Sequence, residues 1–328
     1  MAQKLSLIAD IGGTNARFAL VENDSVNAIE PKVYPCADYP TIVDAIQAYL
    51  QSVDFERPEK AAIAIATPVT SDRIRMTNHT WDFSIKEVSD ALGFNQLKVL
   101  NDYTALALAL SQLTDEHYVK IGGGEQQPAQ VKAVLGPGTG LGVSGAVPVN
   151  NSWVPLEGEG GHVTYGALND EETKVIQLIQ QKIDHVSAEV LVSGPGLSLI
   201  YQVLSELQGN NNQVLKPHEV THKALDQADP IAIQALSMLC GVLGTVAGNL
   251  ALTLGARGGV FIGGGVIPGV VNFFEQSSFR ERFEDHGRFT QYLSEIPTYV
   301  INSAYPALIG ASVSLKSEYQ SIGVNSND

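Results

Sequence analysis

The pair Asn101-Asp102 places an amide beside a carboxylate where a strand-like run, residues 97–100, meets an Ala/Leu-rich run that begins at Thr104. Asn and Asp are favoured helix N-caps because their side-chain oxygens accept hydrogen bonds from the first free N–H groups of a helix. A carboxylate in this position can also accept a proton from a substrate hydroxyl. The stretch alone favours the cap, and the other polar clusters decide whether Asp102 carries chemistry.

A second polar cluster lies on the glycine-rich loop LEGEGGH, residues 156–162, which holds two carboxylates and an imidazole. The segment Ser187-Ala188-Glu189 adds a further carboxylate, and none of these stretches contains Lys or Arg. Carboxylates, amides and imidazoles suit neutral hydroxyl groups, which donate and accept hydrogen bonds, and repel a carboxylate or phosphorylated substrate. The sequence therefore favours a polyol site here, with a solvated acidic turn as the alternative.

Glycine-rich turns follow strand-like runs at three places. Residues 5–11 and 16–22 flank the tip GGTN, residues 131–135 and 141–149 flank GPGTG, and a strand at 259–262 enters a glycine triplet. Such turns can present backbone N–H groups to a phosphate, although each could also be an ordinary tight turn. Asp10 precedes the first tip, where it would repel phosphate unless a cation lies between them, so it suggests Mg²⁺.

Other phosphate and catalytic motifs are excluded. No G-x-x-x-x-G-K-[ST] occurs, so a P-loop is ruled out. Residues 140–145 match G-x-G-x-x-G, but AVPVNNSWVP follows and precludes the helix that a dinucleotide-binding turn requires. Neither H-E-x-x-H nor G-x-S-x-G is present, which argues against a zinc peptidase and a nucleophile elbow.

The two hairpins each head a β-rich half, which predicts a duplicated α/β architecture with two mixed sheets. Helical patterns are expected at residues 41–50, 84–92, 104–113, 171–183, 197–207, 231–254 and 306–315, and further strands at 61–66 and 97–100. Ser84 and Gly93 carry the start and stop signals of the second helix.

The composition of the chain limits which binding partners and which cellular compartment we expect. The 328 residues carry a net charge of −15, with 35 acidic and 20 basic side chains, so we expect neither nucleic acid nor a membrane as partner. Only Cys36 and Cys240 are present, which fits buried thiols in a reducing, cytoplasmic setting. Residues 230–256 hold no charge, but Gly241, Gly244 and Gly248 share one helical face, so we expect a buried helix and not a membrane span.

The motifs taken together resemble the bacterial glucokinase family, within the hexokinase, Hsp70 and actin-like superfamily. In chain order they are ADIGGTNAR at 9–17, MTNHTW at 76–81, Asn101-Asp102, GPGTGLG at 136–142, GEGGH at 158–162, SAE at 187–189 with SGPG at 193–196, and GGVFIGGG at 258–265. The resemblance implies a two-domain actin-like (ribonuclease H-like) ATPase fold with duplicated mixed β-sheets flanked by helices. Residues 1–112 plus 303–328 would form the smaller domain and 113–302 the larger, with the active site in the cleft between them.

The resemblance also implies roles for single residues. Asp102 would be the catalytic base, and the sugar would be held by Asn101, Asp102, Glu159, His162 and Glu189, whereas Glu157 falls outside the matched positions. ATP would be bound by three glycine-bearing segments: Ala9, Asp10, Ile11, Gly12, Gly13 and Thr14; Gly138, Thr139 and Gly140; Gly263, Gly264 and Gly265. Asp10 would hold Mg²⁺ through water. The implied protein is a homodimer that phosphorylates glucose to glucose 6-phosphate, the entry step of glycolysis.

Three alternatives remain at this point. The protein could phosphorylate another neutral hexose, or it could be a non-catalytic sugar sensor on the same fold. An actin- or Hsp70-like ATPase switch would have no use for the set formed by Glu159, His162 and Glu189. The Cys-rich zinc motif of the related repressor/ORF/kinase group is absent, which disfavours a zinc site.

Overall fold

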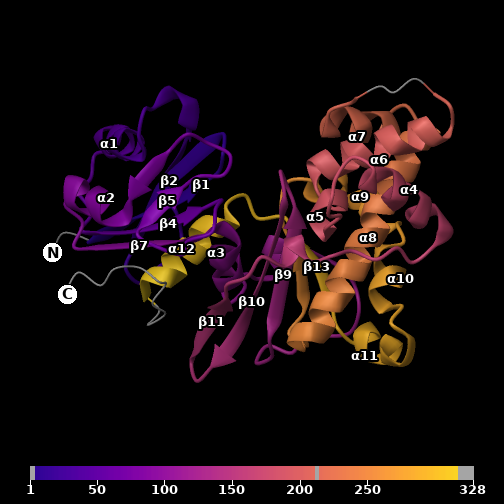
Figure 1. Ribbon diagram of the computed structural model, residues 1–328. Helices are drawn as coiled ribbons and strands as arrows, with labels where there is room; N and C mark the ends of the chain where they lie inside the picture. Colours follow the sequence, from indigo (N-terminus) through magenta and orange to yellow (C-terminus); the bar gives the residue numbers. More distant parts are fainter. Residues whose placement is uncertain (1–3, 211–213, 317–328) are drawn as a thin grey trace. The chain divides into compact units, whose positions relative to one another are not determined.

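The computed structural model describes residues 4–210 and 214–316, and they form two compact units (Figure 1). Unit 1 comprises Met1–Thr114, Ala146–Glu157 and Ser303–Asp328, and unit 2 comprises Asp115–Gly145 and Gly158–Asn302. The chain thus leaves unit 1 and returns to it twice.

Unit 1 is built on a five-stranded sheet of order β3-β2-β1-β4-β7. The strands β1 (Leu5–Ile11), β2 (Asn15–Glu22) and β3 (Ile29–Pro35) form an antiparallel meander. The strands β4 (Lys60–Ile65) and β7 (Gln96–Asn101) add to β1 in parallel. A separate two-stranded ribbon joins β5 (Arg73–Arg75) to β6 (Asp82–Ser84).

Both faces of this sheet are covered, as the alternation of side chains along the strands requires. Leu7, Ala9 and Ile11 of β1 pack against α1 (Ile42–Gln51) and α2 (Ile85–Leu92). Ile8 of β1 and Ala62 of β4 face the other way, toward α12 (Pro306–Lys316). The helix α3 (Asp102–Ala109) covers the same face beside α12.

The helices α3 and α12 approach so closely that one position between them must be glycine. A Cβ on Gly310 of α12 would lie 1.7 Å from the carbonyl oxygen of Ala105 in α3, far inside van der Waals contact. The close packing holds the start of α3, and with it Asp102, against the sheet.

The second sheet repeats the strand order of the first, with one strand added. Its order is β11-β10-β9-β12-β13-β8, formed by β8 (Tyr118–Gly122), β9 (Lys132–Pro137), β10 (Leu141–Val149), β11 (Ser152–Leu156), β12 (Val260–Ile262) and β13 (Thr298–Ile301). As β4 and β7 do beside β1, the strands β12 and β13 run parallel beside β9. The predicted duplication of a mixed sheet is therefore confirmed.

The remaining α-helices of the described residues belong to unit 2. They are α4 (Asp170–Gln180), α5 (Ala188–Leu191), α6 (Gly194–Leu207), α7 (Pro217–Leu225), α8 (Pro230–Leu254), α9 (Val271–Glu275), α10 (Phe279–Glu284) and α11 (Thr290–Ser294). By length and composition α8 could cross a membrane, but 78% of its most apolar window is buried inside the protein. Gly244 and Gly248 of α8 admit the backbone of α10, because a Cβ at either would lie within 2.6 Å of a carbonyl oxygen of α10. The expectation of a buried helix with a glycine face is confirmed.

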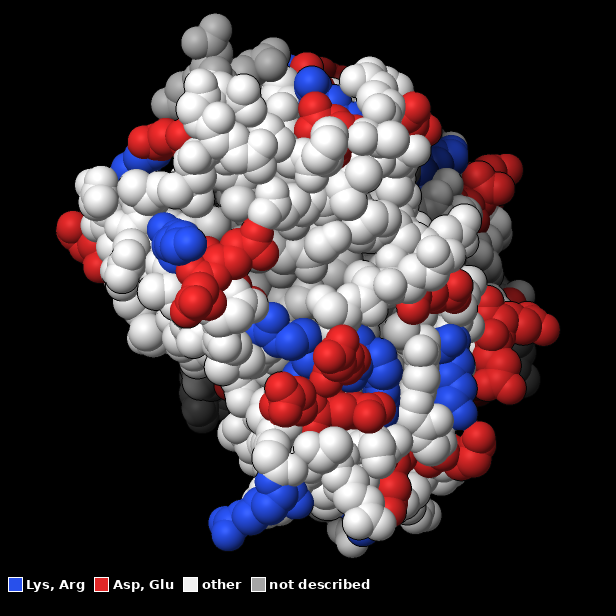
Figure 2. Space-filling view, turned by 90° about the vertical axis from the view of Figure 1, so that its right-hand side faces the viewer, with Lys and Arg blue, Asp and Glu red and all other residues white. Residues whose placement is uncertain are grey.

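Charged side chains of both signs lie next to each other on the face shown in Figure 2. Red and blue groups are interspersed over its lower half, and the middle of its upper half is largely uncharged. This face of the described residues therefore lacks the continuous basic surface with which proteins bind the phosphate backbone of nucleic acids.

Candidate active site

The helix cap at the start of α3 is Asn101 and not Asp102. The Asn101 Oδ1 atom accepts hydrogen bonds from the amides of Tyr103 (2.9 Å) and Thr104 (3.2 Å), and its Nδ2 atom donates to the carbonyl of Thr67 (3.4 Å). The Asn101 side chain also hydrogen-bonds to Asp102, so its amide joins the cap to that carboxylate. Because Asn101 carries the cap, Asp102 occupies the first helical position with its carboxylate available for another task.

Asp102 has a strongly shifted protonation equilibrium. Burial and the nearby carboxylate of Asp10 raise the pKa of Asp102 from 3.8 to about 7, against the opposing hydrogen bonds from the Tyr103 amide and the Asn101 side chain. A carboxylate with a pKa near the working pH is well matched to proton transfer. The end of β7 therefore presents a group that exchanges protons near neutrality.

The first glycine tip follows Asp10 at the end of β1. The amide of Gly12 donates to the carbonyl of Asn15 (3.0 Å), which closes the turn, and Thr14 is exposed at its tip. The side chains of Ala9 and Ile11 are fully buried, so only their backbone could contact a nucleotide. A Cβ on Gly13 would lie 2.7 Å from the Cβ of Asn78, which places the MTNHTW segment directly against this tip.

Arg17 is the counter-ion of Asp10, a role that the motifs did not predict. It lies opposite Asp10 in the β1–β2 register, and its Nη1 atom is 3.1 Å from Asp10 Oδ2. Burial raises the pKa of Asp10, and Arg17 partly opposes that rise. The signal was the hairpin itself, because residues 10 and 17 are equidistant from a four-residue turn and must pair across the strands.

The second and third glycine segments lie together in unit 2. The amide of Gly138 donates to the carbonyl of Gly140 (2.8 Å), and the first residue of α6, Gly194, donates to the carbonyl of Gly138 (2.8 Å). Gly264 adopts a left-handed φ of +79°, and a Cβ there would be 2.3 Å from the carbonyl oxygen of Pro137. The segments Gly138, Thr139, Gly140 and Gly263, Gly264, Gly265 therefore form one backbone surface at the ends of β9 and β12.

Glu159, His162 and Glu189 are brought together against this surface. The His162 Nε2 atom lies 4.0 Å from a Glu159 carboxylate oxygen, and its Nδ1 atom lies 3.8 Å from Glu189 Oε1. The other Glu189 oxygen accepts a hydrogen bond from the amide of Leu141 (2.8 Å). A Cβ on Gly140 would lie 2.4 Å from that same oxygen, so the glycine allows Glu189 to rest on the loop.

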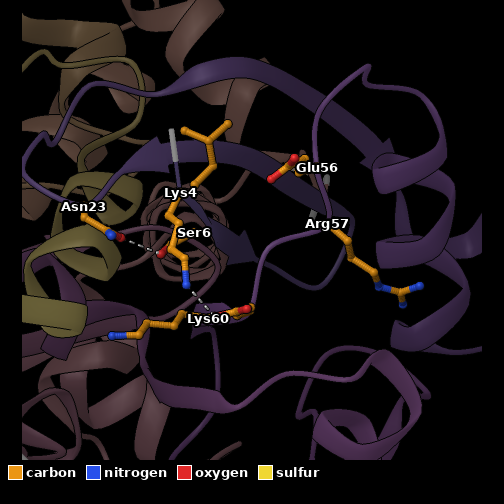
Figure 3. Close-up of a pocket in the computed structure, with 8 residues that line it drawn as sticks. Lys4, Ser6, Asn23, Glu56, Arg57 and Lys60 are labelled. Carbon is orange, nitrogen blue, oxygen red and sulfur yellow. Dashed lines mark hydrogen bonds and ion pairs between the residues drawn. The ribbon is translucent and has the colours of Figure 1, made fainter. Parts of the chain in front are cut away.

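A hollow in unit 1 lies at the opposite end of the strands from Asp10 and Asn101 (Figure 3). It is lined by Lys4, Leu5, Ser6, Asn23, Glu56, Arg57, Glu59 and Lys60. Lys4 pairs with Glu59 (3.3 Å), and the side chains of Arg57 and Lys60 extend in opposite directions. Ligands of open α/β sheets bind at the carboxyl ends of the parallel strands, and this hollow is at the amino ends of β1 and β4.

The described residues contain no group of three or more His, Cys, Asp and Glu side chains that could hold a metal ion. Mg²⁺ commonly relies on one or two carboxylates together with substrate phosphates and water. The carboxylates of Asp10 and Asp102 fit an ion that arrives with a nucleotide.

Two sheets of the same strand order, each with a glycine-bearing hairpin, define an actin-like ATPase fold of the kind that sugar kinases share. A solved glucokinase from an Antarctic psychrotroph superposes with a TM-score of 0.86 at 34% identity, covering 95% of this chain and 99% of that one. The glucokinase family matches residues 7–318, and the chain belongs to this family.

Curated relatives agree with this assignment. A glucokinase of Neisseria meningitidis is 47% identical over 317 residues, which cover 96% of each chain. The bifunctional protein glk of Paraburkholderia xenovorans is 48% identical over 313 residues, covering 94% of this chain and 48% of that protein. The chain therefore spans about half the length of such bifunctional relatives.

Proposed function

We propose that this protein transfers the γ-phosphoryl group of ATP to glucose and yields glucose 6-phosphate, the entry step of glycolysis. The observation that carries the proposal is the Asp102 carboxylate, whose pKa of about 7 suits a general base, in the same unit as the Asp10–Gly13 tip. Membership of the glucokinase family supports glucose as the acceptor and ATP as the donor.

In the proposed reaction Asp102 accepts the proton of the sugar O6 hydroxyl. A bond forms between O6 and the γ-phosphorus, the bond from that phosphorus to the bridging oxygen breaks, and ADP leaves. The backbone N–H groups of the glycine segments stabilise the negative charge of the transferring group. Mg²⁺ would supply further charge compensation when bound with the nucleotide, held through water by Asp10.

We assign the sugar to five residues: Asn101, Asp102, Glu159, His162 and Glu189. Asn101 offers its side-chain amide, and Glu159, His162 and Glu189 exchange hydrogen bonds with the ring hydroxyls. The site residues include no Lys or Arg beyond Arg17, which pairs with Asp10, and this supports a neutral sugar over a phosphorylated one. We also propose a homodimer in the cytoplasm, to which the family and the two buried thiols lend support.

The test is a coupled assay of ADP release with MgATP and a panel of glucose, mannose, fructose and N-acetylglucosamine. We expect Asp102→Asn to lower kcat by about 10²–10⁴-fold while glucose affinity survives, because the base acts only in the transition state. Asp90→Asn, at an exposed position of α2, is the matched control and keeps full activity. A glucose-independent rate of ATP turnover would rule out the kinase, and a different preferred sugar would correct the substrate.

A further inference from the structure

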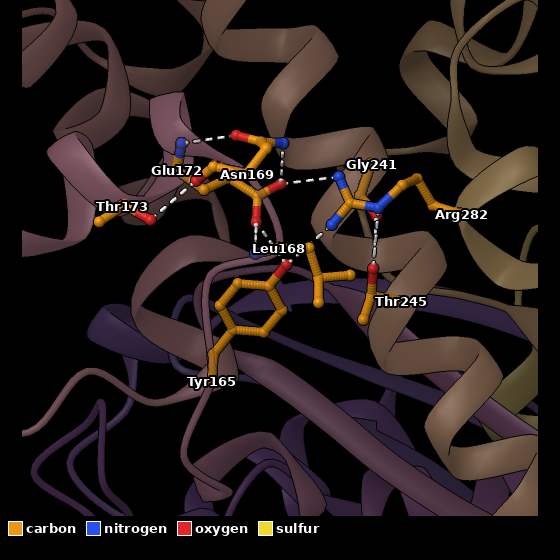
Figure 4. A network of polar contacts seen from close by, with 8 residues as sticks. All are labelled: Tyr165, Leu168, Asn169, Glu172, Thr173, Gly241, Thr245 and Arg282. Carbon is orange, nitrogen blue, oxygen red and sulfur yellow. Dashed lines mark hydrogen bonds and ion pairs between the residues drawn. The ribbon is translucent and has the colours of Figure 1, made fainter. Parts of the chain in front are cut away.

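A buried ionic network joins three helices of unit 2 (Figure 4). Its centre is Glu172 of α4, whose side chain is almost fully buried. The Glu172 carboxylate accepts hydrogen bonds from Arg282 Nη1 (2.7 Å), Tyr165 Oη (3.0 Å), the Leu168 amide (2.9 Å) and Asn169 Nδ2 (3.2 Å). Both oxygens are thus fully engaged, one of them by a charged donor.

Arg282 connects this carboxylate to α8 and to the tyrosine. Its Nε atom donates to Thr245 Oγ1 (3.2 Å) and its Nη2 atom to Tyr165 Oη (3.1 Å). Burial alone would raise the pKa of Glu172, but the hydrogen bonds from Arg282 and Leu168 outweigh it and lower that pKa. The carboxylate is therefore ionised, and the network stays charged at neutral pH.

The network holds the segment that carries the proposed sugar-binding residues. Residues 163–165 pair with residues 186–188 through the Tyr165 amide to the Val186 carbonyl (3.2 Å), the Ala188 amide to the Val163 carbonyl (2.9 Å) and a bridge between Thr164 and Ser187. His162 directly precedes the first of these segments, and Glu189 directly follows the second. Tyr165 therefore fixes one end of this short stretch of paired backbone, and His162 and Glu189 lie at its other end.

We propose that Tyr165, Glu172 and Arg282 are positioning residues that set the affinity for the hexose, an inference that rests on the proposed function. A buried ion pair is weak evidence for stability alone, because well-packed apolar residues of the same volume stabilise a core as well or better. Its hydrogen bonds are directional, however, and four of the six contacts just described fix residues 165, 168 and 169, which follow the GEGGH loop. The network thereby fixes where His162 and Glu189 lie.

The test compares Tyr165→Phe and Glu172→Gln with wild type in steady-state kinetics and in calorimetric titration with glucose alone. Since a buried partner is left unsatisfied, we expect about a 10-fold rise in the glucose KM and Kd, with kcat and the ATP KM within about 2-fold. Tyr165→Phe removes a single oxygen and keeps the fold. Arg282→Lys, which retains the charge, should recover part of the affinity that Arg282→Met loses.

Glu284→Gln is the matched control on the same helix. Glu284 pairs with Arg280 (2.5 Å), and Arg280 binds the carbonyls of Leu293, Ser294 and Ile296, away from that stretch of paired backbone. We expect this variant to lower the melting temperature without moving the glucose KM. An equal rise in KM for Glu284→Gln, or an unchanged KM in folded Tyr165→Phe and Glu172→Gln, would overturn the positioning role.

Amide hydrogen exchange separates this inference from the proposed function. In Glu172→Gln the amides of Tyr165 and Ala188 should exchange faster than in wild type, and in Glu284→Gln they should not. Unchanged exchange would refute the inference whatever the substrate is. Wild-type protein that fails to bind glucose would refute the proposed function while the exchange result still stands.

Discussion

Asp102 destabilises the folded protein when it ionises. Its pKa is about 7 in the folded state and 3.8 as an ordinary side chain. Below pH 3.8 both states are protonated, and the penalty is absent. Between pH 3.8 and 7 the unfolded chain loses its proton first, so the free energy of unfolding falls as pH rises, by at most about 4 kcal/mol at pH 8.

Replacing this carboxylate with an amide should therefore stabilise the protein while it removes the proposed base. We expect Asp102→Asn to unfold at a higher denaturant concentration than wild type at pH 8 and to lose that advantage near pH 4. Denaturation curves of the variant and of wild type at both pH values measure this difference in midpoint. Equal midpoints at pH 8 would mean that ionisation of Asp102 does not lower the free energy of unfolding.

The same equilibrium predicts the pH dependence of catalysis. A base with a pKa of about 7 must be deprotonated to act, so kcat/KM should rise about tenfold per pH unit below neutrality and level off above pH 7 to 8. The Asp10 carboxylate contributes to this high pKa, so Asp10→Asn should move the acidic limb to lower pH, whatever happens to the maximal rate. A limb that stays in place would exclude electrostatic coupling between the two carboxylates.

The contact of Glu189 with the second glycine turn predicts a joint effect on both substrates. A Cβ at Gly140 would meet the Glu189 carboxylate at 2.4 Å, whereas one at Gly138 meets nothing within 4 Å. Gly140→Ala should raise the KM for glucose and ATP together, several-fold each. Gly138→Ala should leave the glucose KM unchanged, and steady-state kinetics with each substrate varied in turn distinguishes the two.

Local motifs reveal some of these residues and conceal others. Asn101, Asp102 and the GEGGH loop stand out because each is a compact run with an evident chemistry. Arg282 lies 110 residues from Glu172, and nothing near Arg282 in the sequence predicts that partner. Long-range ion pairs depend on helix packing, which a single sequence does not specify. The capping role of Asn101 could have been predicted from the sequence, since both Asn and Asp are preferred N-cap residues.

At the level of elements, the α3–α12 contact predicts a large loss of stability. In Gly310→Ala the new methyl group would overlap the Ala105 carbonyl, so the helices must separate. We expect the free energy of unfolding to fall by about 3 kcal/mol. Chemical denaturation measures the loss, with Gly269→Ala, whose Cβ would meet no atom within 4 Å, as the control. A midpoint equal to that of the control would mean that α12 can shift at little cost.

Elements with local signals were predicted well, and edge strands were not. The start of α2 matches its sequence signals, because Ser84 Oγ accepts from the Glu87 amide (3.1 Å) and Gly93 ends the helix at a φ of +69°. The strand β3 was missed, since IEPKVYP carries two prolines and four exposed positions and becomes a strand only through pairing with β2. The strands β8 and β13 likewise depend on partners far away in the sequence.

At the scale of the whole molecule, the separate hydrophobic clusters of the two units predict separable responses to substitution. One cluster of unit 1 includes Ile8, Ala62 and Leu308, and the cluster of unit 2 includes Leu135, Leu243 and Phe279. Gly310→Ala should therefore accelerate hydrogen exchange in β1 and β4, and Gly244→Ala in α8 and α10. Exchange that spreads equally through both units in either variant would show that they unfold as one cooperative body.

The segmented path of unit 1 has a consequence for synthesis on the ribosome. Strands β1 and β4 are translated early, but α12, which covers Ile8 and Ala62, is translated only after the whole of unit 2. At about 5–20 residues per second the wait between β7 and α12 is on the order of 10–40 s. During that interval an apolar face of unit 1 stays open to chaperones, because its covering helix α12 has not yet been made. A ribosome stalled just before residue 306 would thus display a first unit that lacks the helix covering Ile8 and Ala62.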